Sequence, residues 1–282
     1  MIQDAFLRDI IEHRAEFIRA QCELAKLPEN DPRRPGLERR SEELLGQHAG
    51  EWLKPLPEWA VRKPPKWRRG FVAAVWAKGE DFLRGAEELL RLCPLEGACL
   101  TEAREHLPEL LQRTHLANLT SLELYGNGIG AEGAKALAGS PHLANLTSLD
   151  LGRNGIGDEG AVALASSPRL ANLTSLLLGQ NGISAEGAVA LAGSPRLANL
   201  TSLDLDNNGI GDEGAVALAS SPHLANLTTL YLHDNGIGAE GAKALASSPR
   251  LANLTWLDLE YNEIGDEGTE ALRQRFGAGV SC

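Results

Sequence analysis

The sequence predicts an α/β solenoid, with a curved parallel sheet inside and helices outside, preceded by a mostly helical N-terminal capping domain. Three observations carry this prediction. Six copies of a 27-residue unit fill residues 116–277. Each copy joins a strand-like segment to a short segment of small residues with helical character. The chain before residue 116 lacks this period and shows helical patterns instead. A fixed period of this length is typical of a solenoid, whose units bury their apolar faces only against their neighbours.

The repeats begin with a strand. They run 116–142, 143–169, 170–196, 197–223, 224–250 and 251–277, which places a domain boundary between residues 115 and 116 and leaves a short C-terminal cap. In each repeat the pattern L-x-x-L-x-L alternates apolar and polar residues, as in Leu119, Leu122 and Leu124. This period of two is typical of a strand with one buried face.

An asparagine follows each strand at a constant spacing of 27 residues. We expect a structural ladder in which each inward amide bonds backbone N–H and C=O groups that the solenoid would otherwise bury unpaired. The ladder consists of Asn127, Asn154, Asn181, Asn208, Asn235 and Asn262.

A helix closes each repeat. The glycines on either side of Ile129 or Ile156 indicate a turn, Asp158 and its equivalents begin a helix of the type EGAVALAS, and S-P ends it. Alternating strands and helices require parallel strands joined by helical returns. Strands pack ~4.8 Å apart and helices ~8–10 Å apart, so the stack must bend with its strands on the concave side.

The repeat closely resembles the leucine-rich repeat family. The segment N-x-I-G-x-x-G-A-x-x-L-A is similar to that of the ribonuclease-inhibitor-like class, and the resemblance holds over six consecutive copies and about 160 residues. It implies a horseshoe-like scaffold that binds other proteins.

The N-terminal region is predicted to be mostly helical. Helical spacing of apolar residues covers 4–27 (as one helix or two), 37–53, 80–92 and 101–113. The proline-rich segment KPLPEWAVRKPPKW interrupts this pattern, and GFVAAVWAKG predicts a short strand. We expect this region, which holds Trp52, Trp59, Trp67 and Trp76, to seal the apolar end of the first repeat.

Part of this region resembles the bacterial repeat-companion domain that precedes such repeats. The similar segments are AFLRDIIE, RAEFIRAQCELAKL and the W-x-x-GFV of residues 67–72. The family usually carries an acidic, aromatic insert after the first segment, whereas here Glu12 leads directly to His13. A single longer helix is therefore the alternative to that family's helical hairpin. The resemblance implies a bacterial lineage and no particular activity.

Charge and composition exclude several classes of function. The net charge is −11, and residues 116–282 account for nearly all of it, with 8 Lys and Arg against 18 Asp and Glu. This disfavours nucleic acid and anionic membranes as partners and favours a basic protein or peptide. No secretory signal or apolar run long enough for a membrane span is evident, and the four cysteines lack metal-like or CxxC spacing. The simplest expectation is a reduced, cytoplasmic protein.

The positions where the six copies differ carry the functional prediction. Three columns of residues, one from each repeat, are expected on the concave face. The first column reads Glu123, Asp150, Leu177, Asp204, Tyr231, Asp258; the second reads Tyr125, Gly152, Gly179, Asp206, His233, Glu260; the third reads Gly126, Arg153, Gln180, Asn207, Asp234, Tyr261.

The predicted partner-binding residues come from these columns and from Trp256, which breaks a column of Ser and Thr. They are Glu123, Tyr125, Asp150, Arg153, Asp204, Asp206, Tyr231, His233, Asp234, Trp256, Asp258, Glu260 and Tyr261. Aromatic side chains flanked by charge are the usual composition of an interface hot spot, so the last two repeats are expected to bind most strongly. The alternative interpretation is that the acidic residues only keep an exposed sheet soluble.

Two further functions stay open. Because few residues follow the sixth repeat, its strand edge is a candidate for homodimerisation, with Trp256 and Tyr261 at the contact. Repeats of this type also occur in bacterial ubiquitin ligases and in Ran-type GTPase activators. Ligase chemistry would need a reactive cysteine in a C-x-D motif, which Cys22, Cys93 and Cys99 lack, and an activator would need an arginine such as Arg153. We predict no catalytic residues, no metal site and no cofactor.

Overall fold

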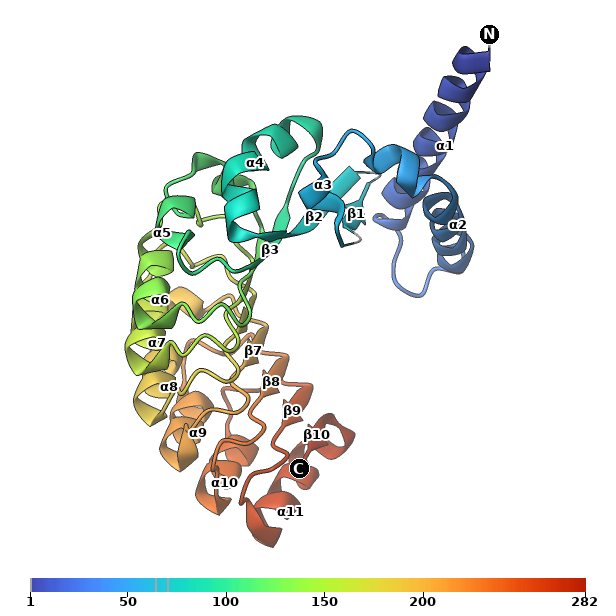
Figure 1. Cartoon of the computed structure of the whole chain (residues 1–282). Helices are drawn as coiled ribbons and strands as arrows, with labels where there is room; N and C mark the ends of the chain where they lie inside the picture. Colours follow the sequence, from blue (N-terminus) through green and yellow to red (C-terminus); the bar gives the residue numbers. More distant parts are fainter. Residues whose placement is uncertain (1, 64, 70) are drawn as a thin grey trace. The chain divides into compact units, whose positions relative to one another are not determined.

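A computed structural model describes residues 2–63, 65–69 and 71–282 of the chain, with side chains from residue 11 onward. These residues form two compact units (Figure 1). Unit 1 comprises the described residues up to Ala77 together with Arg84–Cys99, and unit 2 comprises Lys78–Leu83 and Leu100–Cys282.

Unit 1 is built mainly from helices, as its sequence predicts. The N-terminal segment forms one helix, so the alternative of two short helices is wrong. The elements are α1 (Ile2–Leu24), α2 (Arg34–Leu53), α3 (Glu58–Val61), β1 (Lys66–Arg68), β2 (Phe71–Lys78), α4 (Gly79–Leu92) and β3 (Gly97–Thr101), of which β2, α4 and β3 each extend into unit 2.

Aromatic residues form the centre of unit 1. Phe17 of α1 packs against Trp52 of α2 with ring centroids 5.1 Å apart, and Trp67 of β1 meets both rings edge-on. Arg40 joins the two helices by donating to both carboxylate oxygens of Glu16, at 2.7 and 3.0 Å. The helices α1 and α2 therefore form a hairpin with an aromatic core.

The helix predicted over 101–113 is mostly wrong. Residues 97–101 form strand β3, and only Leu107–Leu110 are helical (α5). The side-chain amide of Asn127 donates to Leu100 O at 2.8 Å and accepts the Ala103 N–H at 2.7 Å. Each later asparagine of the ladder bonds the repeat before it in the same way. Ser140 Oγ donates to Leu111 O in the same manner. Residues 100–111 thus act as a shortened repeat ahead of the first predicted one.

Unit 2 repeats the order strand, turn, helix. Its elements after α5 are η1 (Thr114–Asn118), β4 (Ser121–Glu123), α6 (Gly130–Gly139), β5 (Ser148–Asp150), α7 (Gly157–Ser166), β6 (Ser175–Leu177), α8 (Ala185–Ala192), η2 (Pro195–Leu197), β7 (Ser202–Asp204), α9 (Gly211–Ser220), β8 (Thr229–Tyr231), α10 (Ala239–Ser247), β9 (Trp256–Asp258), α11 (Gly265–Phe276), η3 (Gly277–Gly279) and β10 (Val280–Ser281). Strands β4 to β9 pair in parallel and in chain order, each in register with the next. Within this unit the strands lie along the inner side of a curve and the helices along its outer side (Figure 1).

Leucines and small residues fill the space between strands and helices. The three strand leucines of each repeat are buried, as at Leu149 and Leu151, and the isoleucine of the turn is buried with them. The helices present alanines to this core, which lets them approach closely. This arrangement is the α/β solenoid that the sequence predicts.

Each asparagine of the ladder bonds two repeats. Asn181 Oδ1 accepts the N–H groups of Asn154 and Ile156 at 3.0 and 3.3 Å. Its Nδ2 donates to Leu151 O and Leu178 O, both at 2.9 Å. These backbone groups are buried where water cannot reach them, so the asparagine amide serves as their hydrogen-bond partner.

Successive repeats also alternate in a way that their leucine pattern does not reveal. One position holds Asp158, Asp212 and Asp266 in the second, fourth and sixth repeats, and Ala131, Ala185 and Ala239 in the first, third and fifth. Asp158 Oδ1 accepts the N–H groups of Ser184 and Gly187 in the next repeat, at 2.8 and 3.0 Å. Asp212 does the same for Gly238 and Gly241, at 2.7 and 2.8 Å. An aspartate thus caps the start of each helix that follows an Asp-bearing repeat.

The last strand of the repeats is covered. Val280 and Ser281 pair in parallel with Leu257 and Asp258, and Ser281 O accepts the N–H of Leu259 at 2.7 Å. The strand edge that the sequence predicts to be open for homodimerisation is therefore occupied by β10. Arg275 completes this end by donating to Leu245 O, Ala246 O and Leu251 O. Among the described helices, none is both long enough and apolar enough to cross a membrane.

Candidate binding surface

The strand face of unit 2 carries the first two predicted columns side by side. The parallel register places Glu123 beside Asp150, Asp150 beside Leu177, Leu177 beside Asp204, Asp204 beside Tyr231 and Tyr231 beside Asp258. All six side chains are half-buried, between fully buried leucines. Carboxylates and apolar groups therefore alternate along the middle of the sheet from Asp150 to Asp258.

The acidic side chains of this face also bond the backbone. Asp150 Oδ1 accepts the Gly152 N–H at 2.9 Å, and Asp204 Oδ1 accepts the Asp206 N–H at 2.8 Å. Asp206 Oδ1 reaches the next repeat and accepts the His233 N–H at 2.8 Å. Each of these carboxylates keeps further acceptor capacity for a ligand, because a carboxylate has about four lone-pair sites.

Burial and mutual repulsion shift the ionisation of these acids. Burial raises the pKa of Asp150 and of Asp204 above the ordinary value for aspartate. The pKa of Asp206 rises to about 6, first because of burial and then because of the neighbouring Asp204 charge. Asp204, Asp206 and Asp258 therefore repel one another where repeats four to six meet, and a cation that approached this site would relieve the repulsion.

The aromatic residues lie at both ends of the face. Tyr125 is 51% exposed and covers Gly152, where a Cβ atom would lie 2.8 Å from its ring. At the other end Tyr261 is 78% exposed and Trp256 is 39% exposed. The ring of Tyr261 lies 4.7 Å from that of His233, which brings the two predicted residues together.

The third column is shaped by backbone conformation, which the leucine pattern of the repeat does not predict. All six residues of this column have φ between 49° and 70°. They are Gly126, Arg153, Gln180, Asn207, Asp234 and Tyr261. This left-handed region is costly for most residues other than glycine, asparagine and aspartate. In the sequence, Gly126, Asn207 and Asp234 are the residues of the column whose types indicate this conformation, because they tolerate positive φ.

Arg153 is held by neighbouring side chains. Its guanidinium carbon lies 5.8 Å from the centre of the Tyr125 ring, and its Nε donates to Gln180 Oε1. Arg153 and Tyr125 therefore form one contact group at the N-terminal end of the face, about four strands away from Tyr261.

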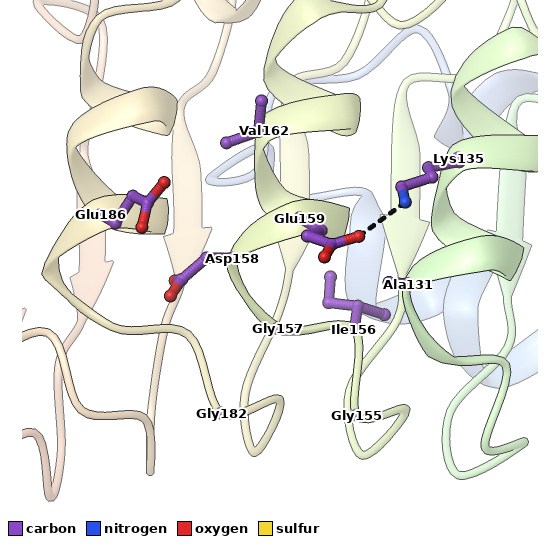
Figure 2. Close-up of a pocket in the computed structure, with 10 residues that line it drawn as sticks. All are labelled: Ala131, Lys135, Gly155, Ile156, Gly157, Asp158, Glu159, Val162, Gly182 and Glu186. Carbon is purple, nitrogen blue, oxygen red and sulfur yellow. Dashed lines mark hydrogen bonds and ion pairs between the residues drawn. The ribbon is translucent and has the colours of Figure 1, made fainter.

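A hollow on the helix side of unit 2 contains none of the predicted binding residues. It has a volume of about 910 Å³ and lies at the turns that lead into α7 and α8 (Figure 2). Lys135 donates to Glu159 at 2.6 Å, which joins α6 to α7 across its edge (Figure 2). The lining residues are Ala131, Lys135, Gly155, Ile156, Gly157, Asp158, Glu159, Val162, Gly182 and Glu186. Asp158 already serves as a helix cap there, so the hollow is explained by the joints between repeats.

Comparisons with known proteins bear on the repeats. A family model described as Leucine Rich repeat matches residues 115–138, 142–165, 169–192, 196–219, 223–246 and 250–272, about half of the chain. A crystal structure of an internalin from Listeria monocytogenes is similar, with 26% identity and a TM-score of 0.43, over 63% of this chain and 45% of the internalin chain. A chain in the crystal structure of the yeast Rad7 and Elc1 complex shares 14% identity with a TM-score of 0.41, over 99% of this chain and 88% of that one. No curated protein matches the sequence.

Proposed function

Because this chain belongs to the leucine-rich repeat family, we propose that it is a non-catalytic scaffold that binds a basic protein or peptide on the strand face of unit 2. Proteins built from such repeats act mainly by protein interaction. The composition of the three residue columns is the observation that supports a basic partner and the strand face. Carboxylates occupy half-buried positions in register, and exposed aromatic rings flank them at Tyr125, Trp256 and Tyr261.

Physical considerations favour a cationic partner. A Lys or Arg side chain that reached Asp150 or Asp204 would find a carboxylate that is partly desolvated, where an ion pair is stronger than at an open surface. Further along the same face, the exposed rings of Trp256 and Tyr261 would supply apolar area and cation–π contacts in the repeat that carries Asp258. Aromatic anchors next to charges that they shield from water are typical of binding hot spots.

The test compares matched charge changes on two faces. Partners are captured from the native cell with the intact chain, in EDTA, and the Kd of the captured protein is measured. Asp150→Asn with Asp204→Asn keeps the amide oxygen as an acceptor for the backbone and removes two charges. We expect Kd to rise about tenfold, which corresponds to ~1.4 kcal/mol. The control, Glu213→Gln with Glu240→Gln, removes two exposed charges from the helix side and should leave Kd unchanged.

A second comparison addresses the aromatic end. Trp256→Ala with Tyr261→Ala should weaken the same complex by at least tenfold, because the two rings supply contact area and exclude water from the carboxylates. A partner that binds both double variants as tightly as the original chain, or that loses affinity with the helix-side control, would contradict a binding site on the strand face.

The alternatives have less support. Self-association through the C-terminal edge would need an unpaired β9, whereas β10 covers that strand. A GTPase-activator role would need Arg153 to reach a partner's nucleotide, whereas this side chain contacts Tyr125 and Gln180. Cys93 is a poor nucleophile for ligase chemistry, because burial raises its pKa to about 11.

A further inference from the structure

One group of side chains on the strand face has the composition of a metal site. His233, Asp258 and Glu260 each offer a ligand atom, and these atoms lie within 4.8 Å of one another. The group is distinguished from the other acids of the face by its imidazole, because His233 is the one histidine in the three columns. Asp150 and Asp204 also lie near acids, but without a nitrogen ligand.

The sheet backbone brings the three residues together. The Leu232 N–H donates to Asp258 O at 2.9 Å, and the Asp234 N–H donates to Glu260 O at 3.0 Å. His233 lies between these two bonds and therefore stands opposite Glu260. Asp258 precedes Glu260 by two residues, and side chains two apart on a strand point to the same face. All three side chains thus leave one small area of two adjacent repeats.

Surrounding groups orient the ligand atoms. Asp258 Oδ1 accepts the N–H of Glu260 at 3.0 Å, which orients that carboxylate. Ser281 Oγ of β10 donates to Glu260 Oε1. The ring of Tyr261 lies against the imidazole of His233. Such supporting contacts orient the ligands of many protein metal sites.

The donor set indicates which ions the site would take. One imidazole nitrogen and two carboxylates suit zinc and related divalent transition ions, whereas Mg²⁺ and Ca²⁺ prefer oxygen ligands alone. Ligand bonds of ~2.0–2.2 Å place neighbouring ligand atoms ~3.3 Å apart in a tetrahedral site. The ligand atoms lie within 4.8 Å of one another, so side-chain rotations that shorten the longest separation by about 1.5 Å would complete this geometry. Three protein ligands would leave a fourth position for water or a partner's side chain.

We propose that His233, Asp258 and Glu260 form a binding site for a divalent transition ion, with zinc as its ligand. The site would link the fifth and sixth repeats through the ion. It does not depend on the binding proposal above, because Asp150, Asp204 and the helix-side control residues lie outside the ligand set.

The test uses the full chain without an affinity tag, stripped with EDTA and then dialysed. Titration calorimetry with zinc chloride should show a saturable site, and Co²⁺ should give visible absorption bands typical of a nitrogen ligand. His233→Ala and, separately, Glu260→Gln should weaken this binding at least about tenfold and reduce the Co²⁺ bands. Zinc should also raise the Tm of the original chain more than that of either variant.

Matched controls separate this site from other zinc-binding groups. Glu123→Gln with Asp150→Asn changes two acids of the same face, and His223→Ala removes a histidine outside the columns; both should bind zinc like the original chain. Circular dichroism checks that each variant is folded, and the exposed position of Glu260 makes Glu260→Gln the safer one. Absence of saturable zinc binding, or equal binding by the folded Glu260→Gln and His233→Ala variants, would overturn the proposal.

Discussion

The two asparagines of a single repeat have different structural roles. The side chain of Asn181 lies within the core and bonds five backbone groups of two repeats. Asn172 is exposed and donates one bond, at 2.7 Å, to Ala144 O. Both belong to invariant columns of the repeat. The two asparagines are equally invariant among the repeats, but we expect them to contribute differently to the free energy of unfolding, because Asn181 is buried and Asn172 is exposed.

We expect Asn181→Ala to lower the free energy of unfolding by about 2–4 kcal/mol, because it leaves buried N–H and C=O groups without partners. Asn172→Ala should cost less than about 1 kcal/mol, since water can replace its bond. Urea denaturation of both variants, followed by circular dichroism, measures the difference. Similar midpoints for the two variants would show that the amide ladder does not stabilise the solenoid.

The residue scale also marks the limit of prediction for the candidate site. The alternation of leucines fixed which positions face outward, so the first and second columns were predictable from the sequence. The third column was not predictable in the same way. Arg153, Gln180 and Tyr261 lie in a turn with positive φ, and their residue types do not indicate that backbone conformation.

At the scale of elements, identical sequences adopt different conformations. Residues 127–138 and 235–246 share the sequence NGIGAEGAKALA. Gly130 has φ of 66° and donates its N–H to Asn154 O, whereas Gly238 has φ of −94° and donates to Asp212. The preceding repeat supplies an aspartate only in the second case. Local sequence could not predict this difference, because its cause lies in a neighbouring repeat.

This cap can be tested with a matched pair of aspartates. Asp158→Ala should reduce stability by about 1–2 kcal/mol, because the N–H groups of Ser184 and Gly187 lose their acceptor. Asp266→Ala changes the equivalent exposed residue of the sixth repeat and should cost less than about 0.5 kcal/mol. Thermal and urea unfolding compare the two. An equal effect would assign the loss to helix propensity instead of the bond between repeats.

The stabilising effect of the Asp158 carboxylate is expected to depend on pH. Burial raises the pKa of Asp158, but hydrogen bonds from Ser184 and Gly187 outweigh it and hold the pKa below the ordinary value of 3.8. The carboxylate therefore stabilises the fold at neutral pH, and this contribution is lost as pH falls below about 4. The difference between Asp158→Ala and the original chain should shrink in acid.

At the scale of the whole molecule, the repeats were predictable and their ends were not. A 27-residue period specified the core, the strand order and the ladder of unit 2. The shortened repeat at 100–111 was missed because its leucines, Leu100, Leu107 and Leu110, have helical spacing as well. The segment β10 was missed because two residues are too few to show a strand pattern. Terminal units that depart from the repeat are expected in solenoids, because they face different neighbours.

We expect the N-terminal region to be required for a soluble chain. Removal of residues 1–99 should yield aggregated or oligomeric material, since an uncapped solenoid exposes apolar side chains and strand backbone. Size-exclusion chromatography with light scattering at two concentrations measures this. A folded, monomeric fragment of residues 100–282 would show that the shortened repeat alone is a sufficient cap.

The alternating aspartates have a consequence for how such an array can change in length. An Asp-bearing repeat fits before a repeat whose helix begins one residue later, as α8 and α10 do relative to α7 and α9. Duplication or loss of residues 143–196, which span one repeat of each kind, preserves every junction type. Loss of one internal repeat would place two units of the same kind in succession, either Asp-bearing or Ala-bearing. We therefore expect an array of this kind to gain or lose repeats in pairs.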